Sequence, residues 1–403
     1  MAPTWGPEWL SARYTLIAIN VAVFVVMLAR GVSFMDPKNS DLISWGADFG
    51  PYIFAGQYWR LLTSAFLHIG ILHLAMNMVS LWIVARPVER LFGKTMTFVL
   101  YLLTGAGASM LDMSWEPMRI SAGASGALFG FLGIIISFFQ FARLDLPPEQ
   151  LRSIRMWAMQ LALINLVLGL SAHVANMAHL GGLVTGLLIG IFLGFTFRDP
   201  VEDHFPRQVR VSLVAAVLLA GVFALIAHAK VDIREIGKGD KAMDRHDYPA
   251  AILHYQKASA LRPRDPDIHA SAGNAFYNSR QWKSAQEEYE RALSLGSQDH
   301  WVQLNLANVY FRLNEPQKAV PLYHACILFT TFDSHDYVDY GSSLRATGDL
   351  RRAESMFRKS IELDPAYFEP HSQLADLYED QGRDAESERE QKIAKELLGK
   401  HPL

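Results

Sequence analysis

Apolar segments long enough to cross a bilayer recur throughout the first 230 residues of this chain. A transmembrane helix needs about 20 mostly apolar residues. Seven segments approach that length: 14–29, 71–85, 95–113, 125–142, 156–172, 178–197 and 211–229. The second and fifth contain several polar residues, which a membrane helix tolerates when they face the bundle interior. The sequence therefore predicts a polytopic, all-α membrane helix bundle in this half of the chain.

The basic residues of the short loops predict how these segments are oriented, because Lys and Arg concentrate in loops that stay in the cytoplasm. The loops after the second, fourth and sixth segments contain Arg86, Arg90, Lys94, Arg143, Arg152, Arg155, Arg198, Arg207 and Arg210. The opposite loops contain only Arg30, Lys38, Arg60 and Arg119. We therefore expect a cytoplasmic N-terminus and, with seven spans, an extracytoplasmic C-terminal half. The N-terminal residues lack the pattern of a cleaved secretory signal, so we expect the first segment to be retained.

A serine and a histidine stand at the starts of two of these segments. Ser125 lies in the run Gly123-Ala124-Ser125-Gly126, and His179 opens the segment that continues Leu180-Gly181-Gly182. Both segments enter the membrane from the outer side in the expected topology, so both residues share one depth near the extracytoplasmic face. An ionisable residue at membrane depth is a functional-site candidate. A serine beside a histidine suits nucleophilic catalysis.

Small residues recur at four-residue spacing along the same two segments. They are Gly126 and Gly130 in the fourth segment and Gly182, Gly186, Gly190 and Gly194 in the sixth. Such spacing lets helix backbones approach closely, and we interpret the glycines as packing residues. Close packing of these two segments would bring Ser125 within hydrogen-bond reach of His179.

His73 and Asn77 are four residues apart, so they share one face of a helix. Two donors on one face could stabilise a developing oxyanion. A metal site and a structural hydrogen-bond network are the alternatives. His68, His73 and Asn77 make a poor ligand set without a nearby carboxylate or cysteine, and we expect neither a metal nor another cofactor.

These residues stand in an order that resembles the rhomboid family of intramembrane serine proteases. The resemblance covers roughly residues 40 to 197 and depends on Trp59-Arg60, His68, His73, Asn77, Glu89-Arg90 before Gly93, Gly123-Ala124-Ser125-Gly126, His179, Gly182 and Gly186. It implies a six-helix membrane core over residues 1–200, followed by a seventh transmembrane helix and linkers over 201–235. We interpret Arg60, Glu89 and Arg90 as structural residues, with Glu89 and Arg90 forming an ion pair, and His68 as structural too.

The resemblance also implies roles for the site residues. Ser125 would be the nucleophile and His179 the general base of a dyad without a third acid. The backbone N–H of Ser125 and the side chains of His73 and Asn77 would form the oxyanion hole. Phe129, where many relatives carry tyrosine, would stack on His179.

Three glycines, Gly123, Gly182 and Gly186, would support this site by their position alone. The implied substrate is a transmembrane protein, cleaved near the extracytoplasmic face in a hydrated cavity within the lipid bilayer. We expect a multi-pass protein of a bacterial inner membrane.

Beyond residue 230 the chain becomes polar and repeats every 34 residues. Small residues keep this step at Gly239, Gly273, Ala307, Gly341 and Ala375, and aromatic residues keep it at Tyr255, Tyr289, Tyr323 and Phe357. A 34-residue period with small residues at helix crossings and an aromatic residue in the second helix is the tetratricopeptide (TPR) signature. We therefore expect a TPR α-solenoid over residues 236–403, joined through a linker at 230–239, that binds a protein or peptide.

Composition excludes some functions. Cys326 is the single cysteine, so an intramolecular disulfide is impossible. The net charge of −3 gives no indication of nucleic-acid binding, which requires a concentrated basic face.

Two functions from different classes remain open. The first is an intramembrane serine endopeptidase whose TPR array recruits substrate or partner proteins. The alternative is a catalytically silent rhomboid-like adaptor that binds transmembrane helices and, through its TPR domain, other proteins. We favour the enzyme because inactive relatives usually lack the serine or the histidine, and this chain has both Ser125 and His179. A seven-span transporter is disfavoured because no inverted repeat is visible. The sequence identifies neither the substrate nor the oligomeric state.

Overall fold

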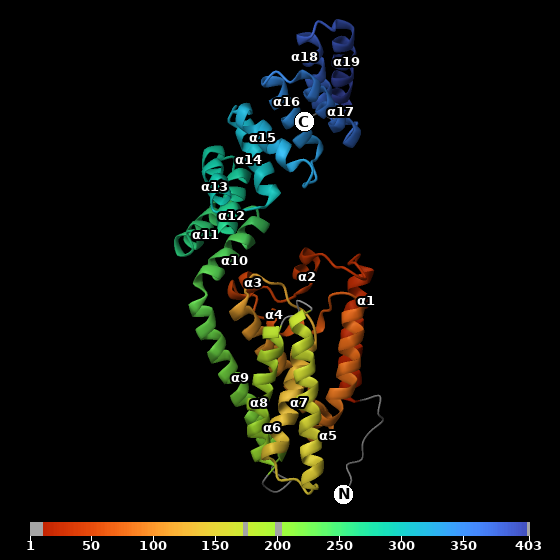
Figure 1. The fold of residues 1–403 in the computed structure, drawn as a ribbon, viewed down its shortest axis with the longest axis vertical. Coiled ribbons are helices and arrows are strands. Elements are labelled where there is room, and N and C mark those ends of the chain that lie inside the picture. The colour runs from red at the N-terminus through yellow and green to blue at the C-terminus, as the bar shows by residue number, and fades with distance from the viewer. Residues whose placement is uncertain (1–10, 172–175, 198–203, 401–403) are drawn as a thin grey trace. The chain divides into compact units, whose positions relative to one another are not determined.

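The computed structural model describes residues 11–171, 176–197 and 204–400 (Figure 1). Helices make up most of this described part, which forms no β-strand and only an isolated antiparallel bridge between Asp48 and Ser121. The chain divides into two compact units, Met1–Gly237 and Lys238–Leu403.

The first unit is a bundle of long apolar helices. Its long helices are α1 (Ala12–Ala29), α5 (Ile71–Trp115), α6 (Ser125–Phe141), α7 (Pro148–Ser171), α8 (Asn176–Thr196) and α9 (His204–Ala229). Among the described residues, α1, α5, α8 and α9 are long and apolar enough to cross a membrane, and α6 is a shorter apolar helix. The prediction of an all-α membrane bundle is confirmed.

Helix α5 contains two of the predicted segments, 71–85 and 95–113. They are joined at Gly93, whose φ of 79° and ψ of 173° interrupt the helical path. A glycine adopts this positive φ without the steric penalty of a Cβ atom. The single long helix is therefore two helices that meet at a break, in agreement with two separate segments.

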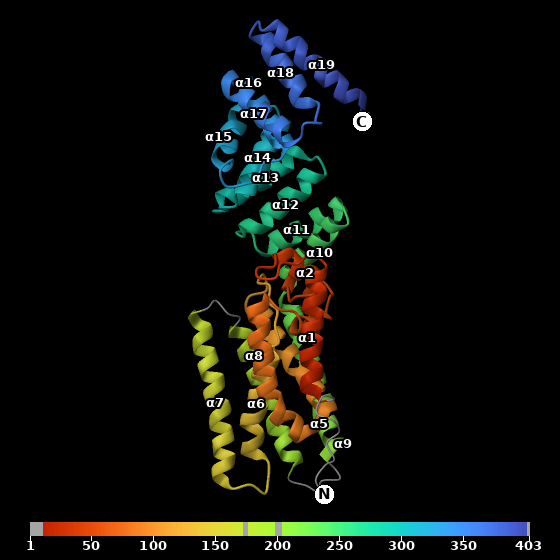
Figure 2. The same ribbon diagram turned by 90° about the vertical axis from the view of Figure 1, so that its right-hand side faces the viewer.

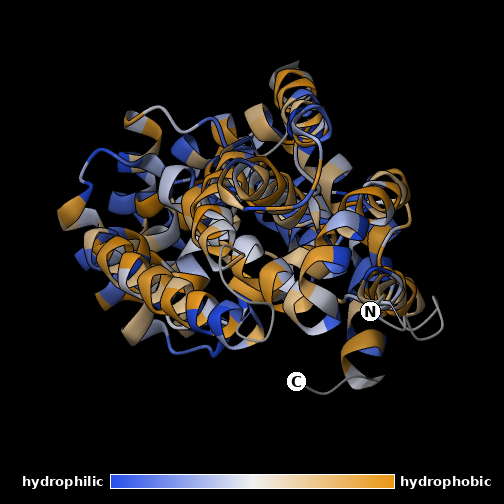
Figure 3. Ribbon diagram, turned by 90° about the horizontal axis from the view of Figure 1, so that it is seen from below, coloured by the Kyte–Doolittle hydropathy of each residue, from blue (hydrophilic) through white to orange (hydrophobic). Residues whose placement is uncertain are grey.

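Helix α9, the seventh apolar segment, is exposed along most of its length. Its large apolar side chains at the surface are Leu213, Val214, Val217, Leu218, Val222 and Leu225. Hydrophobic residues likewise cover the outer faces of the bundle helices (Figure 3). Contiguous exposed apolar surface of this kind is what a lipid-facing helix presents.

Short helices precede α5 and position the loop between α1 and α5. They are α2 (Asn39–Trp45), α3 (Gly50–Phe54), α4 (Arg60–Thr63) and the 3₁₀ turn η2 (Ser64–Phe66). The buried guanidinium of Arg60 donates to the carbonyl oxygens of Ile43 and Ala47, at 2.7 and 2.9 Å. These hydrogen bonds give Arg60 the structural role that we expected.

Glu89 has a different partner from the one that the sequence indicated. We expected an ion pair with Arg90, but the Glu89 carboxylate accepts hydrogen bonds from the backbone N–H groups of Ala12 and Arg13, at 2.7 and 3.3 Å. The first N–H groups of a helix have no partner within it. Glu89 therefore caps the N-terminus of α1, a contact that local sequence does not reveal.

The second unit is a series of paired helices. They are α10 (Val231–Asp244), α11 (Tyr248–Leu261), α12 (Pro266–Asn278), α13 (Trp282–Ser294), α14 (His300–Arg312), α15 (Pro316–Cys326), α16 (Ser334–Ala346), α17 (Leu350–Leu363), α18 (Glu369–Asp380) and α19 (Asp384–Lys400). Successive helices pack against each other, so the TPR α-solenoid is confirmed. Helix α10 covers most of the predicted linker 230–239, which is therefore helical.

The 34-residue period corresponds to one packing contact, repeated between the two helices of a pair. A Cβ atom built on Gly273 would lie 2.6 Å from the ring of Tyr289, and one on Gly341 would lie 2.6 Å from the ring of Phe357. The aromatic ring of the second helix thus packs on the backbone of the first helix. This contact explains why small and aromatic residues alternate at a fixed spacing.

A second feature keeps the same period. The turn within each pair contains a residue with positive φ, and these residues are His246, Arg280, Asn314, Gly348 and Gly382. Three of the five are not glycine, so a glycine pattern does not reveal this turn in the sequence. Positive φ is costly for residues other than glycine, and here the packing of the helix pair imposes it.

Candidate active site

The segment before α6 brings Ser125 to the start of that helix. Gly123 has a φ of 139°, which favours glycine, and its N–H donates to the carbonyl oxygen of Ser64 at 2.9 Å. Helix α6 begins at Ser125, so the backbone N–H of this residue belongs to the first turn, which has no intrahelical acceptors. The hydroxyl group and the backbone N–H of Ser125 therefore lie together at the N-terminus of α6.

His179 lies in the first turn of α8, and its Nε2 is 3.0 Å from Ser125 Oγ. The imidazole is 6% exposed. One of its faces stacks on Phe129, with ring centroids 4.2 Å apart and an interplanar angle of 13°. Nδ1 of His179 is buried and has no hydrogen-bond partner among the described residues. Packing on Phe129 therefore orients the ring in place of a carboxylate.

Glycines hold α6 and α8 at this separation. The two helices pack against each other and form the most extensive contact among the described helices. A Cβ atom on Gly182 would overlap the carbonyl oxygen of Gly126, and one on Gly186 would overlap that of Gly130. The backbones are in direct contact, so no side chain at these positions fits without separating Ser125 from His179.

His73 and Asn77 face the segment that leads into Ser125. Nδ1 of His73 accepts a hydrogen bond from the Ile69 N–H at 3.3 Å, so in the neutral imidazole Nε2 carries the proton. A Cβ atom on Gly123 would lie 3.0 Å from His73 Nε2 and 3.9 Å from Asn77 Nδ2. Asn77 Nδ2 also donates to the His73 carbonyl oxygen at 2.9 Å. The side-chain donors of His73 and Asn77 on α5 therefore both lie near Gly123, two residues before Ser125.

His68 lies next to this group without joining it. Its ring centroid is 5.3 Å from that of His73, and the residue is 1% exposed. Burial, with a smaller contribution from His73, lowers the pKa of His68 to about 3. A neutral, buried ring is consistent with a structural role. No cluster of three or more metal-ligating side chains occurs in the described part of the chain.

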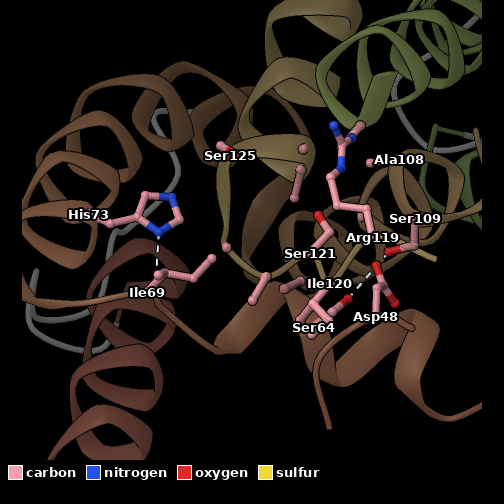
Figure 4. Close-up of a pocket in the computed structure, with 17 residues that line it drawn as sticks. Asp48, Ser64, Ile69, His73, Ala108, Ser109, Arg119, Ile120, Ser121 and Ser125 are labelled. Carbon is pink, nitrogen blue, oxygen red and sulfur yellow. Dashed lines mark hydrogen bonds between the residues drawn. The ribbon is translucent and has the colours of Figure 1, made fainter. Parts of the chain in front are cut away.

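A cavity of about 280 Å³ adjoins Ser125 (Figure 4). Its polar lining comprises Asp48, Ser64, Ser109, Arg119, Ser121, His73 and Ser125. Asp48 is 4% exposed, and burial raises its pKa to about 7 despite the Ser109 and Ser64 hydroxyls. Asp48 was absent from the sequence prediction because only the folding of the first loop brings it near the serine.

Comparison with known proteins places both units in families. A rhomboid-domain profile matches residues 55–196. Profiles of TPR or tetratricopeptide repeats match residues 239–279, 270–326 and 337–367. In the second unit, the chain also resembles the crystal structure of YrrB, a TPR protein with an unusual peptide-binding site. The structural alignment covers 44% of this chain and 92% of the YrrB chain, with 21% sequence identity and a TM-score of 0.41.

Three curated relatives are rhomboid proteins. The chain is 28% identical over 304 residues to rhomboid protease GluP of Bacillus subtilis (strain 168), covering 75% of this chain and 58% of that protein. It is 37% identical over 219 residues to the mitochondrial RHOMBOID-like protein 6 of Arabidopsis thaliana, covering 47% and 70%. It is 30% identical over 203 residues to rhomboid protease AarA of Providencia stuartii, covering 45% and 72%. The match thus spans less than two thirds of the Bacillus protein and more than two thirds of the other two. This chain is therefore a multi-pass membrane protein that belongs to the rhomboid family and carries tetratricopeptide repeats after its membrane bundle.

Proposed function

We propose that this protein is an intramembrane serine endopeptidase that cleaves transmembrane protein substrates with a Ser125–His179 dyad. The observation that carries the proposal is the 3.0 Å separation of Ser125 Oγ and His179 Nε2. A nucleophile and a base within hydrogen-bond reach are the structural signature of covalent catalysis. Curated relatives named as rhomboid proteases support the same reaction.

In the first half of the reaction, Ser125 Oγ attacks the carbonyl carbon of the scissile peptide bond and His179 Nε2 takes the hydroxyl proton. The oxyanion that forms is stabilised by the backbone N–H of Ser125 together with the donors of His73 and Asn77. Preorganised donors of this kind are commonly the largest single contribution to acyl-transfer catalysis. When the C–N bond breaks, His179 returns the proton to the leaving amine and an acyl-enzyme remains.

In the second half, water must reach the ester at membrane depth. The cavity beside Ser125 is lined by the hydroxyls of Ser64, Ser109 and Ser121, so it is polar enough to hold water. His179 then removes a proton from the attacking water and returns it to Ser125 Oγ as the tetrahedral intermediate collapses, which breaks the ester bond and releases the carboxyl product. The dyad thereby returns to its starting state.

We further propose an orientation from the basic loops. The N-terminus lies in the cytoplasm, and the dyad and the TPR unit lie on the extracytoplasmic side of a bacterial inner membrane. Cleavage then occurs near the extracytoplasmic face, and the TPR array recruits substrate or partner proteins. The distribution of Lys and Arg among the loops supports this orientation.

The test uses the full chain in proteoliposomes with a transmembrane substrate and, separately, a fluorophosphonate probe that labels activated serines. We expect Ser125→Ala and His179→Ala to abolish cleavage and labelling. Ser137→Ala is a matched control, because Ser137 lies on the same helix and its hydroxyl donates to the Gly133 carbonyl oxygen at 3.0 Å. Persistent cleavage by either dyad variant would refute the proposal. Substrate binding by the wild type without cleavage or labelling would favour the adaptor.

A further inference from the structure

The cavity beside Ser125 contains a carboxyl group that the proteolytic mechanism does not use. Asp48 lies at the side of the cavity away from Ser125, together with the hydroxyls of Ser64 and Ser109 (Figure 4). Its Oδ1 atom is buried and has no hydrogen-bond partner among the described residues. Leaving a buried polar atom unpaired costs about 1–3 kcal/mol. An acceptor without a protein partner inside a cavity next to a nucleophile is open to a water molecule or to a donor from outside the chain.

The backbone fixes Asp48 relative to the nucleophile. The N–H of Asp48 donates to the Ser121 carbonyl oxygen at 2.8 Å, and the N–H of Ser121 donates to the Asp48 carbonyl oxygen at 3.1 Å. Ser125 follows Ser121 by four positions in the sequence. This bridge therefore joins the first loop to the segment that presents the nucleophile, and the carboxyl group keeps a constant position beside it.

The nearby cations do not neutralise Asp48. Arg119 pairs with Asp112 and Glu116. Arg60 donates to Gln57 and to two backbone carbonyl oxygens. Asp48 itself forms no ion pair within the described ranges. Burial raises the pKa of Asp48 to about 7, and Arg60 offsets this only in part. The carboxyl group thus has no ion-pair partner in the described ranges, and a second acid in the cavity could not ionise beside it without cost.

Small residues leave room between Ser125 and Asp48. The cavity passes Gly105, Ala108 and Ala127. Its volume of about 280 Å³ is many times the ~30 Å³ share of one water molecule. In the tetrahedral intermediate of the acylation step, the oxyanion would face His73 and Asn77 and the leaving amine would lie toward His179. The remaining substituent is the Cα atom of the residue immediately before the scissile bond, and the cavity borders that position.

We propose that Asp48 is a specificity-determining residue that selects the substrate residue immediately before the scissile bond. This inference rests on the proposed proteolytic function. Asp48 accepts a hydrogen bond from a long side chain that carries a donor, glutamine or lysine, and it rejects glutamate. Arg119 is a poor ion-pair partner for an acidic substrate side chain because its guanidinium already pairs with the carboxylates of Asp112 and Glu116. In a second interpretation, Asp48 only binds the water molecule that hydrolyses the acyl-enzyme. Replacing Asp48 would then slow the cleavage of every substrate by the same factor.

The experiment measures kcat/KM for the full-length protein in proteoliposomes with one transmembrane substrate. Four versions of the substrate carry Ala, Gln, Lys or Glu immediately before the scissile bond. We expect the wild type to prefer Lys and Gln over Glu by about tenfold or more, as for a like-charge contact in a desolvated site. Asp48→Asn keeps the shape of the side chain and should lower the Lys-over-Glu ratio about tenfold while changing the Ala rate far less. Asp36→Asn is the matched control, because Asp36 is an exposed carboxyl of the same loop and should leave all ratios unchanged.

Two results would overturn the inference. The first is that the wild-type protein cleaves the Glu version of the substrate as fast as the Lys version. This measurement uses only the wild-type protein, so it tests the inference even if Asp48→Asn does not fold. The other is an equal slowing of all four versions by Asp48→Asn, which is the outcome expected if Asp48 only binds the hydrolytic water. A wild-type protein that cleaves no version and is not labelled by the fluorophosphonate probe would count against the proteolytic function itself.

Discussion

The imidazole of His179 and the phenyl ring of Phe129 are stacked, with centroids 4.2 Å apart and planes 13° from parallel. Because Nδ1 of His179 has no partner in the described part of the chain, this contact is the main restraint on the orientation of the ring. An aromatic face next to a planar ring provides such a restraint without any charge.

Replacing Phe129 should therefore impair chemistry more than substrate binding. We expect Phe129→Ala to lower kcat about 10- to 100-fold, because a small misplacement of a catalytic base is costly. KM should change little. Phe129→Tyr keeps the stacking surface and should retain most of the activity. Steady-state kinetics in proteoliposomes measure both variants, and an unchanged kcat for Phe129→Ala would show that other contacts orient His179.

A methyl group between α6 and α8 should inactivate the protein. Gly182→Ala would place its Cβ atom against the Gly126 carbonyl oxygen, and the helices would have to separate. We expect loss of fluorophosphonate labelling and a lower unfolding temperature. Gly221→Ala, on α9, is the control, because a Cβ atom there meets nothing within 4 Å. That variant should be neutral or slightly stabilised, since Ala favours a helix over Gly.

Removing either side-chain donor of the proposed oxyanion hole should slow the chemical step. We expect Asn77→Ala to lower kcat by about 10²–10³-fold, the usual effect of losing one such donor. His73→Ala should have a similar effect. Because both donors act on one oxygen, the double variant should lose less than the product of the two single losses. Wild-type kcat in both single variants would exclude them from the oxyanion hole.

The first TPR helix pair should lose stability as the pH rises. The carboxylate of Asp240 on α10 accepts a hydrogen bond from Tyr255 at 2.8 Å, and burial raises the pKa of Asp240 from 3.8 to about 6. The folded state therefore keeps a proton that the unfolded state releases near pH 4. The resulting stabilisation is fully present below pH 3.8 and is lost as the pH rises toward 6.

Urea titrations of the full chain between pH 4 and 7 measure this dependence. Asp240→Asn should reduce the dependence of the unfolding free energy of the TPR unit on pH, and the part due to Asp339, whose pKa burial raises to about 7, should remain. Glu362→Gln alters an exposed carboxyl on α17 and should leave the dependence intact. A wild-type unfolding free energy that rises between pH 4 and 6 would contradict the assignment of the buried proton.

Removing the TPR unit should separate recruitment from catalysis. All proposed site residues lie in the unit Met1–Gly237. A chain that lacks residues 238–403 should therefore still react with the fluorophosphonate probe, while its turnover of recruited substrates should fall. Loss of labelling in a correctly folded truncated chain would show that the TPR unit contributes to the site itself.

The sequence predicted features that repeat or that follow from length. Apolar runs near bilayer length predicted the helices, and the 34-residue period predicted the helix pairs of the TPR solenoid. The expected topology also put Ser125 and His179 at one depth, and in the structure Ser125 Oγ and His179 Nε2 lie 3.0 Å apart. These inferences depend on local patterns along single elements.

Contacts between elements that are distant in sequence were not predictable in the same way. Glu89 caps α1 from 76 residues or more away, although its neighbour Arg90 was the expected partner. Asp48 reaches the cavity only because the first loop pairs with Ser121. The positive φ of Arg280 follows from how two helices meet, and no property of an arginine predicts it.

The contact between Gly182 and Gly126 has one more consequence. No side-chain rotamers lie between two main chains in direct contact, so rotamer changes cannot alter their separation. We therefore expect the contact between α6 and α8 to be rigid. If the proposed reaction requires a motion that admits the substrate, we expect it in elements that pack less extensively, such as α7 at the edge of the bundle (Figure 2). Nucleophile and base would stay in register throughout that motion.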